Sequence, residues 1–171
     1  MLAMAKTHHI CFFLRNRTDD LIVEVRKQDA DRLVERLGND VGEVLRTGFF
    51  WFGTVDGRSI VINLEDVQGA RILWDVTAHP PDTLRHVGQV AIYLRGRASP
   101  IEDNTDNLES LYDLFTNLEY GPETVPFPRL IDEDDEPIYL NAREVVMVVA
   151  PTHLLQEGGR RIAIEDGLEE D

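Results

Sequence analysis

The chain repeats part of its own sequence, and this feature constrains its fold more than any other. A shift of 78 positions aligns residues 56–67 (DGRSIVINLEDV) with residues 134–145 (DDEPIYLNAREV), so that an Asp, an Ile, an Asn and a Val coincide. At the same shift an apolar stripe with helical spacing recurs: Ala30, Leu33, Val34 and Leu37 align with Leu108, Leu111, Tyr112 and Phe115. A shift of 80 aligns residues 13–17 (FLRNR) with residues 93–97 (YLRGR). Three blocks in the same order predict an internal duplication.

Each copy shows the pattern of a strand, a helix, a hairpin and a final strand. Residues 21–25 predict an additional strand in the first copy. The first helix is expected to begin at Asp29 and end at Gly38, and the second to begin at Asp106 and end at Gly121. The dipeptide Asp56-Gly57 predicts the hairpin turn of the first copy.

Two asparagines stand at matching positions just after the second hairpin strand of each copy. We expect Asn63 and Asn141 to cap one helical turn before the chain enters the final strand, because an asparagine side chain accepts hydrogen bonds from backbone N–H groups nearby. The final strands are predicted over residues 67–74 and 145–150.

These patterns predict an α+β fold, dominated by strands, in which two similar strand-helix-hairpin-strand repeats pack with pseudo-twofold symmetry. Residues 1–157 form one globular domain in this interpretation, with repeats over about 11–76 and 89–151 and a linker over 77–88 that contains Pro80-Pro81. Residues 158–171 carry two adjacent glycines and five acids, which predicts a flexible acidic tail.

Charge decides which partners suit the chain. Its 17 Lys and Arg residues against 32 Asp and Glu residues give a formal net charge of -15. A field of this sign repels phosphate backbones and attracts basic surfaces, so nucleic acid is not an expected partner and a basic protein is. The longest apolar run, residues 145–150, is far too short to cross a membrane. Without a recognisable secretion signal, and with a single cysteine, the chain is expected in the cytoplasm.

Motifs for common chemistries are missing, so no catalytic residue, metal or cofactor is predicted and an enzyme is not favoured. The sequence has no P-loop, no dinucleotide-binding glycine motif and no zinc-type cysteine spacing. Cys11 precedes two phenylalanines and is expected to be buried and inert. The acidic run over residues 132–136 lacks the spacing of a calcium loop, although a weak divalent-cation site stays open.

Two pairs of arginines stand out in this acidic chain. Arg15 and Arg17 match Arg95 and Arg97, and residues two apart on a strand point to the same face. One interpretation is that these arginines neutralise carboxylates of the chain itself. The other is an anion site at the junction of the repeats, which would bind phosphate or carboxylate through bidentate hydrogen bonds.

A run of aromatic residues predicts an interface. Phe50, Trp51 and Phe52 alternate between the two faces of a strand, so a second layer or another copy must cover the outer ones. We expect burial at an interface between repeats or between copies.

The sequence leaves three candidate functions for the chain. The first is a non-enzymatic protein-interaction or regulatory module that self-associates as a homo-oligomer. The second is a binder of small anionic ligands, or an enzyme, with its site at the junction of the repeats. The third is an acidic inhibitor that mimics nucleic acid, whose binding to basic proteins would weaken steeply with salt.

Overall fold

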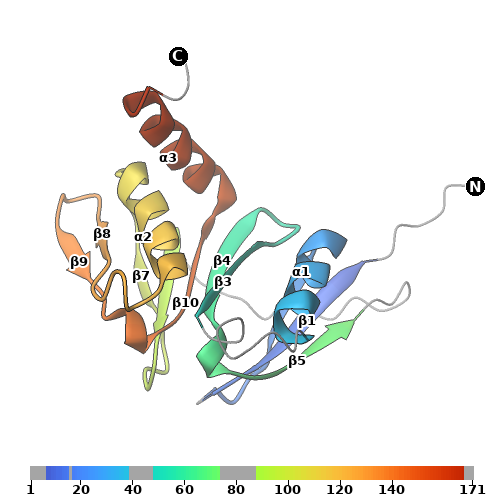
Figure 1. Ribbon diagram of the computed structural model, residues 1–171. Helices are drawn as coiled ribbons and strands as arrows, with labels where there is room; N and C mark the ends of the chain where they lie inside the picture. Colours follow the sequence, from blue (N-terminus) through green and yellow to red (C-terminus); the bar gives the residue numbers. More distant parts are fainter. Residues whose placement is uncertain (1–6, 16, 39–47, 74–87, 168–171) are drawn as a thin grey trace, which may run out of the picture.

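The protein combines strands and helices, as a computed structural model of residues 7–15, 17–38, 48–73 and 88–167 shows (Figure 1). This described part contains ten strands in three sheets and three α-helices, which confirms the predicted α+β class. Residues 77–87 of the predicted linker and residues 168–171 of the predicted tail lie outside the described residues.

Two halves follow one another with the same order of elements. The first half, up to residue 73, contains β1 (His8–Leu14), β2 (Leu21–Val25), α1 (Lys27–Gly38), β3 (Phe49–Gly53), β4 (Arg58–Asn63), the short helix η2 (Leu64–Asp66) and β5 (Val67–Leu73). The second half, residues 88–151, contains β6 (Val90–Leu94), β7 (Ile101–Asp103), α2 (Leu108–Tyr120), β8 (Arg129–Ile131), β9 (Pro137–Tyr139), the short helix η3 (Ala142–Glu144) and β10 (Val145–Pro151). The helix α3 (Thr152–Glu165) follows it.

Every strand pairing is antiparallel, and one sheet joins the halves. Among the described residues the first sheet has the order β2-β1-β5, the central sheet has the order β3-β4-β10-β6-β7, and the third consists of β8 and β9. Strand β4 of the first half pairs with β10 of the second, so the central sheet draws strands from both halves.

The strand registers of the first half recur in the second. We call two positions equivalent when a shift of 78 residues, or of 80 for the strands before each helix, joins them. Phe12 lies opposite Leu21 as Ile92 lies opposite Ile101, and Trp51 opposite Val61 as Arg129 lies opposite Tyr139. Strand β5 has a bulge where it meets Leu14 of β1, and β10 has the equivalent bulge where it meets Leu94 of β6.

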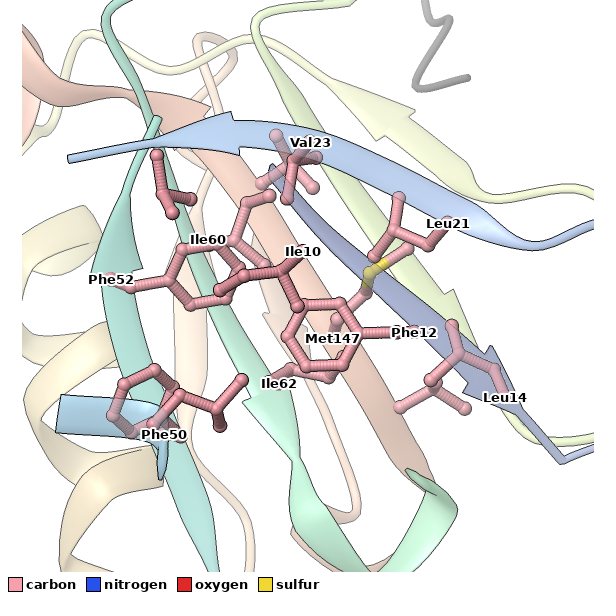
Figure 2. Close-up of a cluster of buried hydrophobic side chains, with 14 of the residues drawn as sticks. Ile10, Phe12, Leu14, Leu21, Val23, Phe50, Phe52, Ile60, Ile62 and Met147 are labelled. Atoms are coloured by element: carbon pink, nitrogen blue, oxygen red, sulfur yellow. The ribbon is translucent and has the colours of Figure 1, made fainter. Parts of the chain in front are cut away.

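Four strands of the central sheet, β3, β4, β10 and β6, are buried on both faces over most of their length, because they alternate apolar side chains between two cores. On one face the side chains of β3 and β4 pack with the first sheet and α1 (Figure 2); this cluster includes Ile10, Phe12, Leu33, Phe50, Phe52, Ile60 and Ile62. On the other face Phe49 and Val61 pack against α2, in a cluster that also contains Leu130 of β8. Such alternation follows from the two-residue period of a strand.

Helices and hairpins therefore alternate along the molecule. The hairpin β3–β4 lies between α1, with which it shares the first cluster, and α2, with which it shares the second. The hairpin β8–β9 packs on α2 through Leu130 and the partly buried Ile138. In Figure 1 this hairpin lies at one end of the molecule, and α1 and β5 lie at the other.

The pairing between the halves is not reciprocal in the described part of the chain. Strand β4 joins β10, but β9, which is equivalent to β4, does not join β5. The predicted pseudo-twofold packing requires both contacts, so the strand pairing gives it no support.

The C-terminal segment differs from its prediction. Residues 158–165 belong to α3, so the predicted flexible tail is wrong there. Gly158 lies where α3 packs closely against α2, since a Cβ at this position would overlap the carbonyl group of Leu108. The glycine allows this close contact and does not end the helix. Close packing against α2 thus stabilises a segment whose composition alone suggested disorder.

The predicted helix starts shift slightly. Helix α1 begins at Lys27, so Asp29 lies in its first turn and pairs with Arg32 at 2.8 Å. Helix α2 has Asn107 as its N-cap, one residue after the predicted Asp106, and Gly121 ends it with a φ of 93°.

Candidate functional site

Arg15 and Arg95, one from each predicted repeat, both bind the short helix η2, which contains the buried Asp66. Asp66 is 1% exposed, and the Nε of Arg95 donates to its two carboxylate oxygens at 2.9 and 3.1 Å. The backbone N–H of Arg15 donates to the carbonyl oxygen of Asp66 at 2.8 Å, and its side chain donates to the carbonyl oxygen of Glu65 at 3.4 Å.

Burial and positive charge act in opposite directions on Asp66. Burial raises the pKa of Asp66 above its ordinary value, while the hydrogen bond and charge of Arg95, and the charge of Arg15, lower it. The desolvation of the carboxylate is the larger effect. Arg95 pairs with this carboxylate and serves as its counter-ion.

The second member of each arginine pair lies apart from Asp66. The guanidinium of Arg17 lies over the ring of Tyr93, with its carbon 4.7 Å from the ring centroid. The backbone N–H groups of Arg17 and Arg97 donate to Leu14 and Leu94 in equivalent turns. Of the four arginines, Arg95 thus pairs with carboxylates, whereas the side chain of Arg15 contacts a backbone carbonyl and that of Arg17 an aromatic ring.

The aromatic run joins the two halves. Phe50 and Phe52 are 3% and 1% exposed in the core shared with the first sheet, so layers of the chain itself cover them. Trp51 points to the opposite face, where its ring centroid lies 6.2 Å from that of Tyr112 and 5.2 Å from that of Phe115 on α2. The strand is covered on both faces by the chain's own layers.

Asn63 and Asn141 occupy equivalent caps. The side-chain oxygen of Asn63 accepts from the N–H of Glu65 at 3.0 Å, and that of Asn141 accepts from the N–H of Arg143 at 3.1 Å. Asn63 also donates to the carbonyl oxygen of Val145 at 3.1 Å, which ties η2 to the second half.

Three exposed apolar side chains are equivalent to residues in the contact between the halves. Phe127, two residues before β8, and Tyr139 of β9 are 59% and 61% exposed, whereas the equivalent Phe49 and Val61 are buried against α2. Val34 on α1 is 50% exposed, and its equivalent is Tyr112, the residue of α2 that meets Trp51. The sequence repeat aligns each of these three residues with its equivalent, but it does not show which member of each pair is exposed.

Strand β5 is an edge strand in the described part of the chain. It pairs with β1 alone, while the equivalent β10 pairs on both sides and is buried over most of its length. Gln68 and Arg71 of β5 are exposed, and Ala70 and Ile72 are only partly buried. No described strand pairs with its other edge, and an edge of this kind can accept another strand.

Two hollows flank α1. One of about 530 Å³ lies between the halves and is lined by Arg32, Trp51, Tyr112 and Thr152 among others. The other, of about 750 Å³, lies over α1 and is lined by Ala30, Asp31, Val34, Val55 and Ile72 among others. The first places cationic and aromatic groups together, and the second is mainly apolar with charged residues at its rim.

The residues considered for catalysis or metal binding are placed as follows. Cys11 is buried, and burial together with the charge of Asp20 raises the pKa of its thiol. In the acidic run, one carboxylate oxygen of Asp132 accepts from the backbone N–H groups of Asp134 and Glu136, both at 2.9 Å, so the run forms a closed turn. The described residues contain no group of three or more His, Cys, Asp or Glu residues arranged to hold a metal ion.

The helices of the described ranges are all too short or too polar to span a membrane. In comparisons with known proteins, no family model, no curated protein and no solved structure matches this chain.

Proposed function

We propose that this chain is a protein-interaction module that self-associates head to tail, and that the contact between copies repeats the contact between its own halves. The observation that carries this proposal is the equivalence of the exposed Phe127 and Tyr139 with Phe49 and Val61, which are buried between the halves.

An internal duplication underlies the proposal. The same order of elements, the recurring registers and the bulge at equivalent places in β5 and β10 support a common origin of the halves. Duplicated units that pack on each other in a head-to-tail manner leave one unmatched surface at each end.

The two unmatched surfaces are the hairpin β8–β9 at one end and the surface of β5 and α1 at the other. We expect them to contact each other as the hairpin β3–β4 contacts β10 and α2 within one chain. Between the halves, Val61 of β4 lies opposite Val148 of β10. The equivalent pairing places Tyr139 of one copy opposite Ala70 on β5 of the next. Phe127 and Tyr139 then face α1 of that copy, as Phe49 and Val61 face α2 within one chain. Arg129, the equivalent of Trp51, then lies by Val34, the equivalent of Tyr112.

Energy and geometry are consistent with association. Burying two large side chains contributes about 1.5–3 kcal/mol each, and pairing removes the exposed edge of β5. The two surfaces lie at opposite ends of the molecule (Figure 1), so the contact is heterologous and gives a ring or an open chain of copies. The net charge of -15 opposes it through repulsion that salt screens.

Sedimentation equilibrium over a range of protein concentrations tests the proposal. The average mass is expected to rise with concentration, and more steeply at higher salt. Tyr139→Lys should weaken association at least tenfold, because it places a charge where the next copy packs. Tyr120→Ser is the matched control, since Tyr120 is 69% exposed and does not belong to the three equivalent positions. A monomer at every concentration and salt, or equal effects of both variants, would contradict the proposal.

A further inference from the structure

We infer that Glu144 of one copy pairs with Arg15 of the next, and that this ion pair makes the contact selective for a second copy of this chain. Arg15 directly follows β1, and Glu144 ends the short helix η3, which follows β9. The inference rests on the proposed head-to-tail association and adds the charged groups that decide which surface each end accepts.

Inside the chain, the short helix η2 receives an arginine from each half. Arg15, of the same half, donates its backbone N–H to the carbonyl oxygen of Asp66 at 2.8 Å. Arg95, of the other half, donates its Nε to the two carboxylate oxygens of Asp66 at 2.9 and 3.1 Å. Its Nη2 also lies 3.5 Å from Oε2 of Glu65. The charged link between the halves is therefore a carboxylate of η2 and an arginine of the following half.

The equivalent helix η3 receives an arginine only from its own half in the described part of the chain. Arg95 donates its backbone N–H to the carbonyl oxygen of Glu144 at 2.9 Å, as Arg15 does to that of Asp66. Glu144 stands at the position equivalent to Asp66. It is exposed, and its carboxylate has no cationic partner among the described residues. The arginine that would complete η3 comes from a following copy, in which the equivalent of Arg95 is Arg15.

Arg15 is available for this role. Its side chain is exposed and donates to the carbonyl oxygen of Glu65 at 3.4 Å, which is long for a hydrogen bond. Asp66 already has Arg95 as its counter-ion. A guanidinium held by one weak, neutral acceptor gains a charge-assisted hydrogen bond when it reaches a carboxylate.

The proposed strand register brings the two groups together. Within the chain the side chain of Asn63 donates to the carbonyl oxygen of Val145 at 3.1 Å, just before η2 begins. The equivalent bond between copies joins Asn141, which is exposed, to Val67. Val67 lies opposite the last residue of β1, and Arg15 is the next residue along the chain. The contact therefore places η3 of one copy beside Arg15 of the next.

The charges around this place favour contact between unlike ends. Arg143 of η3 stands at the position equivalent to Glu65, but its guanidinium binds Glu123, which offsets its charge. Two copies that met through like ends would bring two carboxylates or two arginines and no ion pair. Charge complementarity thus selects the head-to-tail arrangement.

A charge swap tests the inference by sedimentation equilibrium of the full chain. Arg15→Glu and Glu144→Arg each place like charges at the contact, so each should weaken self-association by at least about tenfold. An equal mixture of the two variants should associate as tightly as the unchanged chain. In the mixture one kind of contact joins the two substituted residues and the other joins the two unchanged ones, so opposite charges meet in both.

Lys27→Glu and Asp166→Arg are the matched controls, because they change the net charge by the same amounts. The Lys27 side chain is 72% exposed, its ion pair with Asp31 lies at the surface, and Asp166 is exposed at the end of α3. Neither residue is equivalent to one in the contact between the halves. Both variants should associate like the unchanged chain, alone or mixed.

A milder pair of variants covers a loss of stability in Arg15→Glu, which brings a carboxylate near the buried Asp66. Arg15→Gln and Glu144→Gln each remove one partner and should weaken association by similar factors. The double variant should associate no more weakly than either single variant, because the pair is already broken. Effects that simply multiply would contradict the inference.

The outcomes separate this inference from the proposed function. If the unchanged chain associates and the swapped variants associate equally well, the ion pair is absent although self-association stands. If both variants are weakened and their mixture does not recover, Glu144 and Arg15 do not meet. A chain that stays monomeric at every concentration and salt contradicts the proposed function and this inference together.

Discussion

Replacing Arg95 with methionine is expected to lower the free energy of unfolding by about 3 kcal/mol at pH 7, the lower end of the range for breaking a buried ion pair. Arg95 supplies two hydrogen bonds to Asp66, whose side chain is 1% exposed, and methionine would leave that carboxylate buried without its counter-ion. Arg95 itself is 30% exposed, which is why the lower figure applies.

The loss should depend on pH in a definite direction. Burial already raises the pKa of Asp66 above 3.8, and removal of Arg95 would raise it further. A carboxyl group with a raised pKa in the folded state favours folding when protonated, and this contribution is lost as the pH rises through the folded-state pKa. The deficit of Arg95→Met should therefore be largest near neutral pH and shrink as the pH falls toward 4.

Urea unfolding at a series of pH values measures this dependence. The control is Arg95→Met in an Asp66→Asn background, which has no carboxylate to leave unpaired. Relative to Asp66→Asn alone, its deficit should hardly vary with pH. A deficit of Arg95→Met that stays constant from pH 4 to pH 7 would show that Asp66 is not the group on which Arg95 acts.

Gly158→Ala is expected to lower the free energy of unfolding by about 2 kcal/mol, although alanine normally stabilises a helix relative to glycine by about 1 kcal/mol. The new Cβ would overlap the backbone carbonyl group of Leu108, which cannot move without shifting α2. Gly159→Ala is the matched control, because its Cβ would meet the ring of Tyr112, a side chain that can rotate away.

Urea unfolding and limited proteolysis at α3 report this difference. We expect Gly158→Ala to be destabilised and to be cleaved faster within α3, and Gly159→Ala to change little. If Gly158→Ala instead raises stability, α3 does not pack on α2 as closely as the structure has it.

Local features of the fold follow from local sequence. The apolar stripe from Leu108 to Leu118 and the turn at Asp56-Gly57 lie in the elements predicted, because helix periodicity and turn chemistry depend on neighbouring residues. Asn63 and Asn141 cap the turns right after their strands for the same reason.

Contacts between distant residues could not be predicted in this way. Nothing near Asp66 in the sequence indicates that Arg95 would bind it, and a single strand pattern cannot tell that α2 would cover Trp51. The helix α3 was missed because Gly158 reads as a helix breaker until its close approach to Leu108 is known. The exposure of Val34, Phe127 and Tyr139 could not be predicted for the same reason, because it depends on which other layers of the chain cover these residues.

The central claim is that one copy contacts the next as the first half contacts the second, and disulfide crosslinking tests it most directly. Between the halves Ile60 lies opposite Val149, so the claim places Ile138 of one copy opposite Arg71 of the next. Opposed Cα atoms in an antiparallel pair are about 4.5–5.5 Å apart, within reach of a disulfide.

The measurement mixes Arg71→Cys chains with Ile138→Cys chains, both carrying Cys11→Ala, under mild oxidation. Tyr139 and Phe127 stay in place in both. The account predicts rapid formation of the mixed disulfide, and little when Ile138→Cys is replaced by Tyr120→Cys. Equal, slow crosslinking of Arg71→Cys with either partner would contradict the account.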